Sequence, residues 1–399
     1  MKITDIKARE ILDSRGNPTL EVSMMNDKGQ SVVFGVPSGA STGEKEALER
    51  RDGDINRYNG MGVKNCVDEI ENNLKEGLMR IPLGDQSEFD GALATFDPSE
   101  KKEKLGANTM LGLSGAYLKL SALSSGQKLW QYISEISKSG PSLPRIYANL
   151  INGGKHAPGL DIQEVMVVPK ETRPSVAVEQ IVSFRRELAK KLSEEYGESS
   201  LLIGDEGGFV PQNARHAKVL AIFSSIEGDF EIALDVAASS FYENGKYHFE
   251  GKDVTAEELG GWYQANSNNI LSVEDPFEEH DSESFANLAS NASFFVIGDD
   301  LTVTSATLID EFATKSAISG VIIKPNQIGT ISETLAAVAA AQASDVKIIV
   351  SHRSGETNDD FIADLACGIG AFGIKIGAPV RGERVAKYNR LLQIEKEGL

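Results

Sequence analysis

The chain has 399 residues, of which 41% are hydrophobic and 25% charged. This globular composition excludes disorder, a fibre or a coiled coil as a description of the whole chain. Its 40 basic and 59 acidic residues give a net charge of −19. So acidic a surface repels nucleic-acid phosphates and anionic lipids, and the apolar runs are too short to span a bilayer. We therefore expect no nucleic-acid partner and no membrane insertion.

The cysteines and the first residues bear on the cellular compartment. Cys66 and Cys367 are too few for a disulfide framework, which favours a reducing environment. Residues 1–5 contain no apolar signal core. We expect a cytoplasmic protein and leave an additional surface or secreted pool open.

The first part of the chain predicts a small mixed domain. Residues 19–24 and 31–36 alternate like strands around a turn at 26–29. Apolar residues at helical spacing follow over 63–78, and a second helix is predicted over 109–121. Residues 137–144 are rich in Pro, Gly and Ser, and we place the domain boundary there.

After this boundary, short apolar runs alternate with amphipathic helices. The runs are 146–151, 165–168, 201–203, 232–234, 270–273, 294–297, 321–323, 348–350 and 372–374. This alternation indicates a parallel sheet covered by helices, and its length fits a closed (β/α)8 barrel. An open doubly wound sheet is the alternative, although no Gly-rich dinucleotide motif follows an early strand.

Ionisable residues follow seven of these runs directly or within three residues. They are Glu206, Asp235, Glu274, Asp299, Lys324, His352 with Arg353, and Lys375. In a parallel barrel these strand ends meet at one mouth, where such enzymes keep their active sites. Charged residues also end strands where a chain leaves the core, which explains one or two cases better than seven.

Three of the acids predict a metal site. Asp235, Glu274 and Asp299, delivered from neighbouring strands, would repel one another unless a cation lay among them. Hard oxygen ligands favour Mg²⁺ over zinc. Salt bridges to barrel lysines and arginines are the alternative.

Two further pairs predict acid–base chemistry. Lys324 and Lys375, near each other and near Mg²⁺, would disfavour each other's charge, so at least one pKa should fall towards neutrality and yield a general base. Glu206 and Glu164 could share a proton, leaving one of them an acid. Because Glu164 precedes its apolar run, it reaches the mouth only if strand 165–168 runs antiparallel, and the short connection 152–163 permits this.

Three segments could bind an anion or cover it. His352, Arg353 and Ser354 offer an imidazole, a guanidinium fork and a hydroxyl suited to phosphate. The Gly-rich segment 152–156 carries His156, and the small residues 38–43 could fold over a ligand as a lid, or be an ordinary connection.

Eight segments resemble motifs of the enolase family, and the resemblance covers essentially the whole chain. They are residues 13–19, 38–43, 163–164, 204–208, 272–277, 299–302, 324–330 and 351–357. The resemblance implies an N-terminal α+β capping domain with a mobile lid loop over residues 1–136. It also implies a modified TIM barrel over 137–399, of order ββαα(βα)6, with the second strand antiparallel.

The family's roles can be carried over by residue. The resemblance implies that Lys324 is the catalytic base and Glu206 the acid, assisted by Glu164. It implies that Asp235, Glu274 and Asp299 bind one Mg²⁺, and that Ser41 reaches a second Mg²⁺ bound with substrate. The groups around the substrate would be Arg353 and Ser354 at the phosphate, His156 near the leaving hydroxyl and phosphate, Lys375 beside the carboxylate, and Gln163 and His352 as polar neighbours.

The implied reaction is the reversible dehydration of 2-phosphoglycerate to phosphoenolpyruvate in glycolysis and gluconeogenesis, by a homodimer or higher homo-oligomer. Two positions depart from the family pattern, Ile376 for a common Thr and Met61 for a frequent Lys, and the chain is short between Glu206 and Glu274. Neither substitution removes a group that the chemistry needs, and the short stretch bears on surface and oligomer contacts more than on the site. Another dehydratase or racemase of the superfamily and a non-catalytic binding role remain as alternatives.

Overall fold

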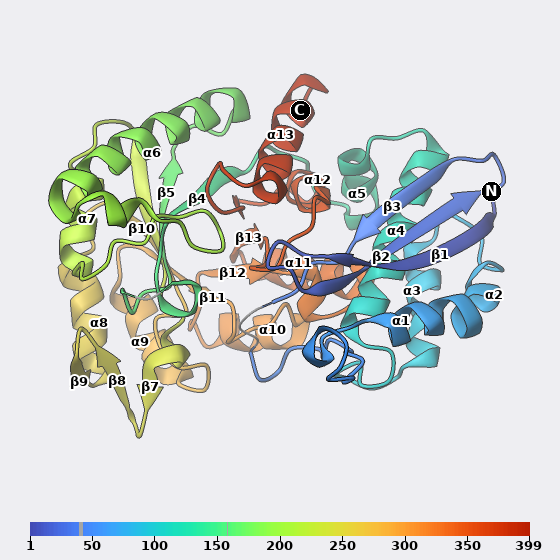
Figure 1. The fold of residues 1–399 in the computed structure, drawn as a ribbon, viewed down its shortest axis with the longest axis horizontal. Coiled ribbons are helices and arrows are strands. Elements are labelled where there is room, and N and C mark those ends of the chain that lie inside the picture. The colour runs from blue at the N-terminus through green and yellow to red at the C-terminus, as the bar shows by residue number, and fades with distance from the viewer. Residues whose placement is uncertain (40–42, 158) are drawn as a thin grey trace.

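The computed structural model describes residues 1–39, 43–157 and 159–399. Figure 1 shows two groups of elements side by side, with the N-terminal strands and helices in blue on the right and the remaining elements around a barrel on the left. No helix among the described residues is long and apolar enough to cross a membrane.

The N-terminal group is a three-stranded antiparallel sheet backed by helices. Strands β1 (Ile3–Leu12), β2 (Pro18–Asn26) and β3 (Ser31–Gly35) pair in that order. The predicted hairpin is therefore confirmed, and β1, which was not predicted, extends it. Helix α4 (Ala107–Ser125) packs on the sheet so closely that a Cβ on Gly115 would lie 2.3 Å from the Phe34 ring.

The other helices of this group are short. They are α1 (Lys64–Glu69), α2 (Lys75–Leu78), α3 (Gln86–Phe96) and α5 (Leu129–Ser137), with a π-helical turn over Ile70–Leu74 between α1 and α2. The helical spacing over 63–78 is thus confirmed.

The larger group is a closed barrel of eight strands. These are β4 (Arg145–Asn152), β5 (Glu164–Pro169), β6 (Phe230–Asp235), β10 (Ile270–Glu274), β11 (Phe295–Gly298), β12 (Gly320–Ile323), β13 (Lys347–Ser351) and β14 (Gly373–Lys375). Strand β5 is antiparallel to both neighbours, and its first residue, Glu164, pairs with Asn152 and Asp235. The inversion therefore brings Glu164 to the end of the barrel at which the parallel strands finish, as the sequence predicted.

Helices cover the barrel from outside. Two of them, α6 (Pro174–Tyr196) and α7 (His216–Ser224), follow β5, and one follows each of the six later strands. The six are α8 (Ala256–Ala265), α9 (Ser282–Asn291), α10 (Ala306–Thr314), α11 (Ile331–Ala343), α12 (Phe361–Gly368) and α13 (Gly382–Lys396). The order ββαα(βα)6 is confirmed.

The barrel interior is a packed core distinct from the layer between strands and helices. Its buried residues are Tyr147, Met166, Val168, Ala233, Leu271, Ile297, Ile322 and Ile349. Alternate residues of the same strands, such as Val321 and Ile323, face the helices instead. Since side chains fill the barrel, a ligand can bind only at its mouth.

One predicted strand is wrong. Residues 201–203 do not join the barrel: Glu198–Leu201 form a 3₁₀ turn, and Ile203 makes only an isolated bridge to Phe209. Leu202 and Ile203 are 62% and 42% exposed. An unpredicted small sheet also lies outside the barrel, made of β7 (Tyr242–Glu243), β8 (Lys246–Phe249) and β9 (Lys252–Val254).

The close packing of α4 on the N-terminal sheet can be tested with two glycines. Gly115→Ala should lower the free energy of unfolding by about 1 kcal/mol or more, because its Cβ would overlap the Phe34 ring. Gly91→Ala, inside α3 with no atom near its added methyl group, should raise that free energy by up to about 1 kcal/mol. Urea denaturation measures both, and equal effects of the two substitutions would contradict this packing.

Candidate active site

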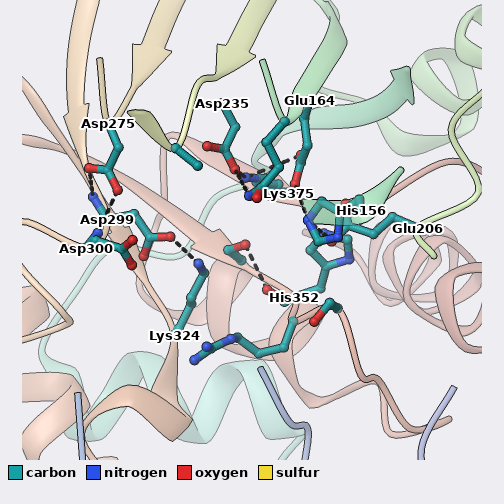
Figure 2. Close-up of a pocket in the computed structure, with 15 residues that line it drawn as sticks. His156, Glu164, Glu206, Asp235, Asp275, Asp299, Asp300, Lys324, His352 and Lys375 are labelled. Carbon is teal, nitrogen blue, oxygen red and sulfur yellow. Dashed lines mark hydrogen bonds and ion pairs between the residues drawn. The ribbon is translucent and has the colours of Figure 1, made fainter. Parts of the chain in front are cut away.

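A polar pocket lies at the barrel mouth, and nearly all predicted site residues line it (Figure 2). The lining residues are His156, Gln163, Glu164, Glu206, Asp235, Ala237, Asp275, Asp299, Asp300, Lys324, Ser351, His352, Arg353, Ser354 and Lys375. Glu274 lies against Lys375. Ser41 lies outside the described residues. The structure thus places every described residue that the sequence predicted for the site at one mouth. Among the described residues, however, the three acids whose oxygens lie within 4.8 Å of one another are Asp275, Asp299 and Asp300, not the predicted Asp235, Glu274 and Asp299.

Lys375, the last residue of β14, lies at the centre of one carboxylate group. Its Nζ is 2.7 Å from Asp235 Oδ2, 3.0 Å from both oxygens of Glu274 and 3.3 Å from Glu164 Oε2. Figure 2 shows it between Asp235 and Glu164. Burial alone would lower the pKa of Lys375, but the surrounding carboxylates raise it well above its ordinary value.

Lys324, directly after β12, pairs with a different carboxylate. Its Nζ donates to Asp299 Oδ2, and Asp299 Oδ1 accepts a second hydrogen bond from Gln327 Nε2 at 2.9 Å. Burial opposes the charge of Lys324, yet Asp299 raises the pKa of Lys324 above its ordinary value. Each ammonium contacts carboxylates that raise its pKa, so the fall expected for a lysine beside Mg²⁺ stays a prediction.

Asp275 and Asp300 form a second acidic cluster with Asp299, which sequence reasoning missed. One carboxylate oxygen from each of the three lies within 4.8 Å of the others. Asp275 accepts the backbone amides of Asp299 at 2.9 Å and of Asp300 at 2.8 Å. Burial and the Asp299 charge raise the pKa of Asp300 to about 7. The sequence contained a signal for this cluster. Strand β10 ends in Glu274 followed by Asp275, strand β11 is followed by Asp299 and Asp300, and only the first acid of each pair was considered.

On the side of the pocket opposite this acidic cluster, His156 lies between two buried glutamates. Its Nε2 is 3.7 Å from Glu164 Oε1 and 3.6 Å from Glu206 Oε1. Burial and the Glu206 charge raise the pKa of Glu164 well above its ordinary value. Burial would raise the pKa of Glu206 too, but His352 and His156 outweigh it and hold that pKa well below its ordinary value. The surroundings of the two carboxyls therefore favour the protonated form of Glu164 over that of Glu206.

Glu206 reaches the pocket from a tight turn, not from a strand end. Gly204 N donates to Gly208 O at 2.9 Å across this turn. Gly207 has φ 84°, and a Cβ there would lie 2.6 Å from Val380 Cγ2. Only glycine fits that conformation and contact, which explains the glycines that flank Glu206.

Arg384 of α13 fixes the orientation of the segment that follows β13. This fully buried guanidinium contacts His352 Nδ1 at 2.8 Å and donates to Arg353 O and Ser354 O at 2.7 Å each. Arginine has no acceptor, so His352 Nδ1 accepts and the ring proton lies on Nε2, 3.3 Å from Glu206 Oε1. Burial lowers the pKa of His352 to about 4, which keeps the imidazole neutral. No motif in the sequence singled out Arg384.

The N-terminal domain closes one wall of the pocket through Arg353. Arg353 Nη1 lies 3.0 Å from Glu46 Oε2 and 3.0 Å from Asn326 Oδ1. Ser38 and Gly355 exchange backbone hydrogen bonds of 2.7 and 2.9 Å. Ser354 Oγ is buried and makes no hydrogen bond with the described residues, so it can donate to an anion.

Comparisons with known proteins agree with this geometry. Residues 3–133 match the family model "Enolase, N-terminal domain", and residues 141–398 match "Enolase, C-terminal TIM barrel domain". The chain belongs to the enolase family. The enolase of Methanosarcina acetivorans is 43% identical over 408 residues, covering 99% of this chain and 94% of that protein. The enolase of Ureaplasma parvum is 41% identical over 428 residues, covering 100% and 96%.

The family membership confirms the resemblance, the fold and the enzyme class, a hydro-lyase. The enolase family is metal-dependent, and the pocket offers oxygen ligands for a divalent cation. Asp235 and Glu274 already converge on one positive charge, the Lys375 ammonium, and Gln163 Oε1 is buried without a partner among the described residues. All these donors are hard oxygens. The residues present therefore fit Mg²⁺.

The neutral His352 should make stability depend on pH. An unfolded histidine binds a proton below about pH 6.5, whereas folded His352 does so only below about pH 4. Stability is therefore lost as the pH falls through this window, by about 2 kcal/mol between pH 7 and pH 5. Urea unfolding in chelator should show this extra loss in the wild-type chain relative to His352→Asn. Parallel pH profiles for the two proteins would contradict a buried neutral histidine.

Proposed function

We propose that this chain catalyses the reversible dehydration of 2-phosphoglycerate to phosphoenolpyruvate, through the site residues described above. The observation that carries the proposal is the arrangement of one pocket. Lys324 and Lys375 lie among carboxylates on one side, and Glu206 lies with Glu164 and His156 on the other. A substrate between them meets a candidate base and a candidate acid at once.

We infer a magnesium requirement from the charge of the pocket. Six carboxylic acids line it, against the cations Lys324, Arg353 and Lys375. A phosphorylated hydroxy acid carries three negative charges and needs more positive charge than these residues supply. Asp235, Glu274 and Asp299 would hold one Mg²⁺, and Ser41 would reach a second. When bound, the ions would offset the negative charge that develops on the substrate carboxylate.

Lys324 is the proposed base. The proton to be removed lies next to a carboxylate, so its loss places a second negative charge on that group. Lys324 can accept the proton only as a neutral amine, and anything that draws Asp299 away from its Nζ lowers the pKa of Lys324 towards that state. Lys375, which keeps several carboxylate partners, stays charged and would bind the substrate carboxylate.

Glu206 and Glu164 are the proposed acid pair. The raised pKa of Glu164 favours its protonated form, and His156 lies between the two carboxyls. Glu206 therefore has a proton source within the site for the departing hydroxide. Arg353 and the Ser354 hydroxyl, which has no hydrogen-bond partner among the described residues, would bind the phosphate, with His156 near it. Gln163 and His352 would orient these groups.

Three further features of the protein remain proposals. We place the boundary between a capping domain and the catalytic barrel at residues 136 and 137, which the extended connection from the end of α5 at Ser137 to β4 at Arg145 supports. We expect a homodimer or higher homo-oligomer and a cytoplasmic location.

The reaction is tested by the growth of phosphoenolpyruvate absorbance from 2-phosphoglycerate. We expect turnover with Mg²⁺ and none in excess chelator, restored on adding Mg²⁺ back. Activity on an unphosphorylated hydroxy acid in preference to 2-phosphoglycerate would favour another dehydratase of the superfamily. No turnover of either acid would favour a binding role.

Substitutions separate the two proton transfers. Lys324→Ala should slow exchange of the substrate's C2 proton by about 10²-fold or more, because the base is gone. Glu206→Gln should exchange that proton yet fail to eliminate hydroxide. Lys347→Ala, at the opposite end of strand β13, serves as the control and should change neither rate. Proton exchange retained in Lys324→Ala would remove Lys324 as the base.

A further inference from the structure

His216 is a buried histidine that the proposed chemistry does not use. It begins α7 on the outside of the barrel and is 3% exposed. Its ring stacks on Phe249 at 4.7 Å between centroids and meets the edge of Trp262 at 5.9 Å. Figure 1 shows α7, α8 and the small sheet β7–β9 together on this side of the barrel.

The imidazole joins the β4–β5 connection to this outer group. Nε2 accepts the backbone amide hydrogens of Asp161 at 3.1 Å and Ile162 at 3.2 Å. Nδ1 is 3.1 Å from Glu250 Oε1, and the amide of Glu250 donates to Asp161 Oδ2 at 2.8 Å. Since Nε2 faces two donors, it carries no proton, and the ring proton lies on Nδ1 towards Glu250.

Glu250 is held in an unusual backbone conformation for this contact. Glu250 and Gly251 form the two-residue turn between β8 and β9, with φ of 48° and 74°. Such a turn favours residues like Asn and Gly at both positions. A glutamate there is accounted for by its carboxylate, which contacts Nδ1 of His216 and accepts the His216 backbone amide at 3.1 Å.

The segment that His216 holds leads directly into the active site. Ile162 precedes Gln163, whose Nε2 donates to Asp235 Oδ2 at 3.2 Å, and then Glu164. The start of the β4–β5 connection is hydrogen-bonded to its end. Gly153 N donates to Gln163 O at 2.9 Å, and Gly154 N donates to Leu160 O at 2.8 Å. A Cβ on Gly153 would lie 2.4 Å from Ile162 O, so the two strands of this loop touch.

We propose that His216 is a positioning residue for the active-site connection over residues 153–157 and 159–163. By accepting two backbone amides, it fixes the register in which His156 and Glu164 enter the pocket. The role in catalysis rests on the proposed function, whereas the role in holding the loop does not.

The proposal has a signature in pH. Protonation would turn Nε2 from an acceptor into a donor that faces two backbone amide donors. A charged His216 therefore cannot accept the hydrogen bonds that attach the loop to it. The charged groups around the ring are Asp161 on the loop, Glu250 and Lys252 on the hairpin, Arg215 before α7 and Glu258 on α8. Burial, opposed by Glu250 and Asp161, lowers the pKa of His216 below its ordinary value. The attachment should therefore weaken as the pH falls below about 6.5.

Residue-resolved hydrogen exchange tests the attachment directly. In His216→Ala the amides of Asp161 and Ile162 should exchange about tenfold faster or more than in the wild-type chain, since both lose their acceptor. His216→Gln can present an uncharged oxygen to these amides and should restore most of the protection. The matched control is His248→Gln, an exposed histidine on the same hairpin that pairs only with Asp253 among the described residues. It should leave both amides unchanged.

Two further readouts separate positioning from mere stability. As the pH is lowered below about 6.5, tryptophan fluorescence should drop more in the wild-type chain than in His216→Gln, because charged His216 quenches Trp262. At pH 7.5, kcat for 2-phosphoglycerate should fall about tenfold in His216→Ala and recover in His216→Gln.

The outcomes distinguish this inference from the proposed function. Unchanged exchange at Asp161 and Ile162 in both His216 variants would overturn it, even in a fully active enzyme. Faster exchange in His216→Ala with unchanged kcat would overturn the positioning role. The expected exchange pattern in a chain without 2-phosphoglycerate turnover would leave the loop attachment standing and refute the proposed function.

Discussion

The site depends on the mutual repulsion of carboxylates that the barrel buries at its mouth. Asp235, Glu274 and Glu164 share the Lys375 ammonium, and Asp299 shares Lys324. Buried carboxylates are tolerated only when cations neutralise them or when protons do. Here both occur, because the lysines are held charged while Glu164, Glu274 and Asp275 have raised pKa values. The substrate-free pocket is therefore an arrangement of opposite charges that a bound cation and anion would rearrange.

The inverted second barrel strand, β5, places Glu164 between the two groups of buried carboxylates at the mouth. Because β5 runs antiparallel, Glu164 lies beside Asp235 and still reaches across to His156 and Glu206. A regular parallel strand would carry Glu164 to the opposite end of the barrel. Its proton would then be unavailable to Glu206.

The sequence predicted the strand ends well, because a buried strand followed by an ionisable residue is a local pattern. It also predicted the reversal at Glu164 from one residue on the wrong side of its run. Prediction from the sequence failed where the structure depends on contacts between residues far apart in the chain. Residues 201–203 are as apolar as a strand, yet no neighbouring strand leaves an edge for them. The pairing of Lys324 with Asp299 and of Lys375 with Asp235 was not predicted either, because in each pair the lysine and the aspartate come from different strands.

Other residues that support the site could not be identified from the sequence. Arg384 and Lys387 are a turn apart on a charged helix and read as surface residues, but both are buried against the segment after β13. His216 has no motif around it, and its partners come from an irregular loop and a hairpin turn. Backbone amides as partners of a side chain cannot be read from residue types.

The anchoring of His352, Arg353 and Ser354 by α13 has a consequence for biosynthesis. The eight barrel strands are complete at Lys375, but the guanidinium that orients the phosphate-side segment arrives only with residue 384. A nascent chain that has closed its barrel and not yet docked this helix has every proposed reacting group and an unfinished site. An oriented phosphate-side segment therefore requires that α13 pack onto α12 and α6.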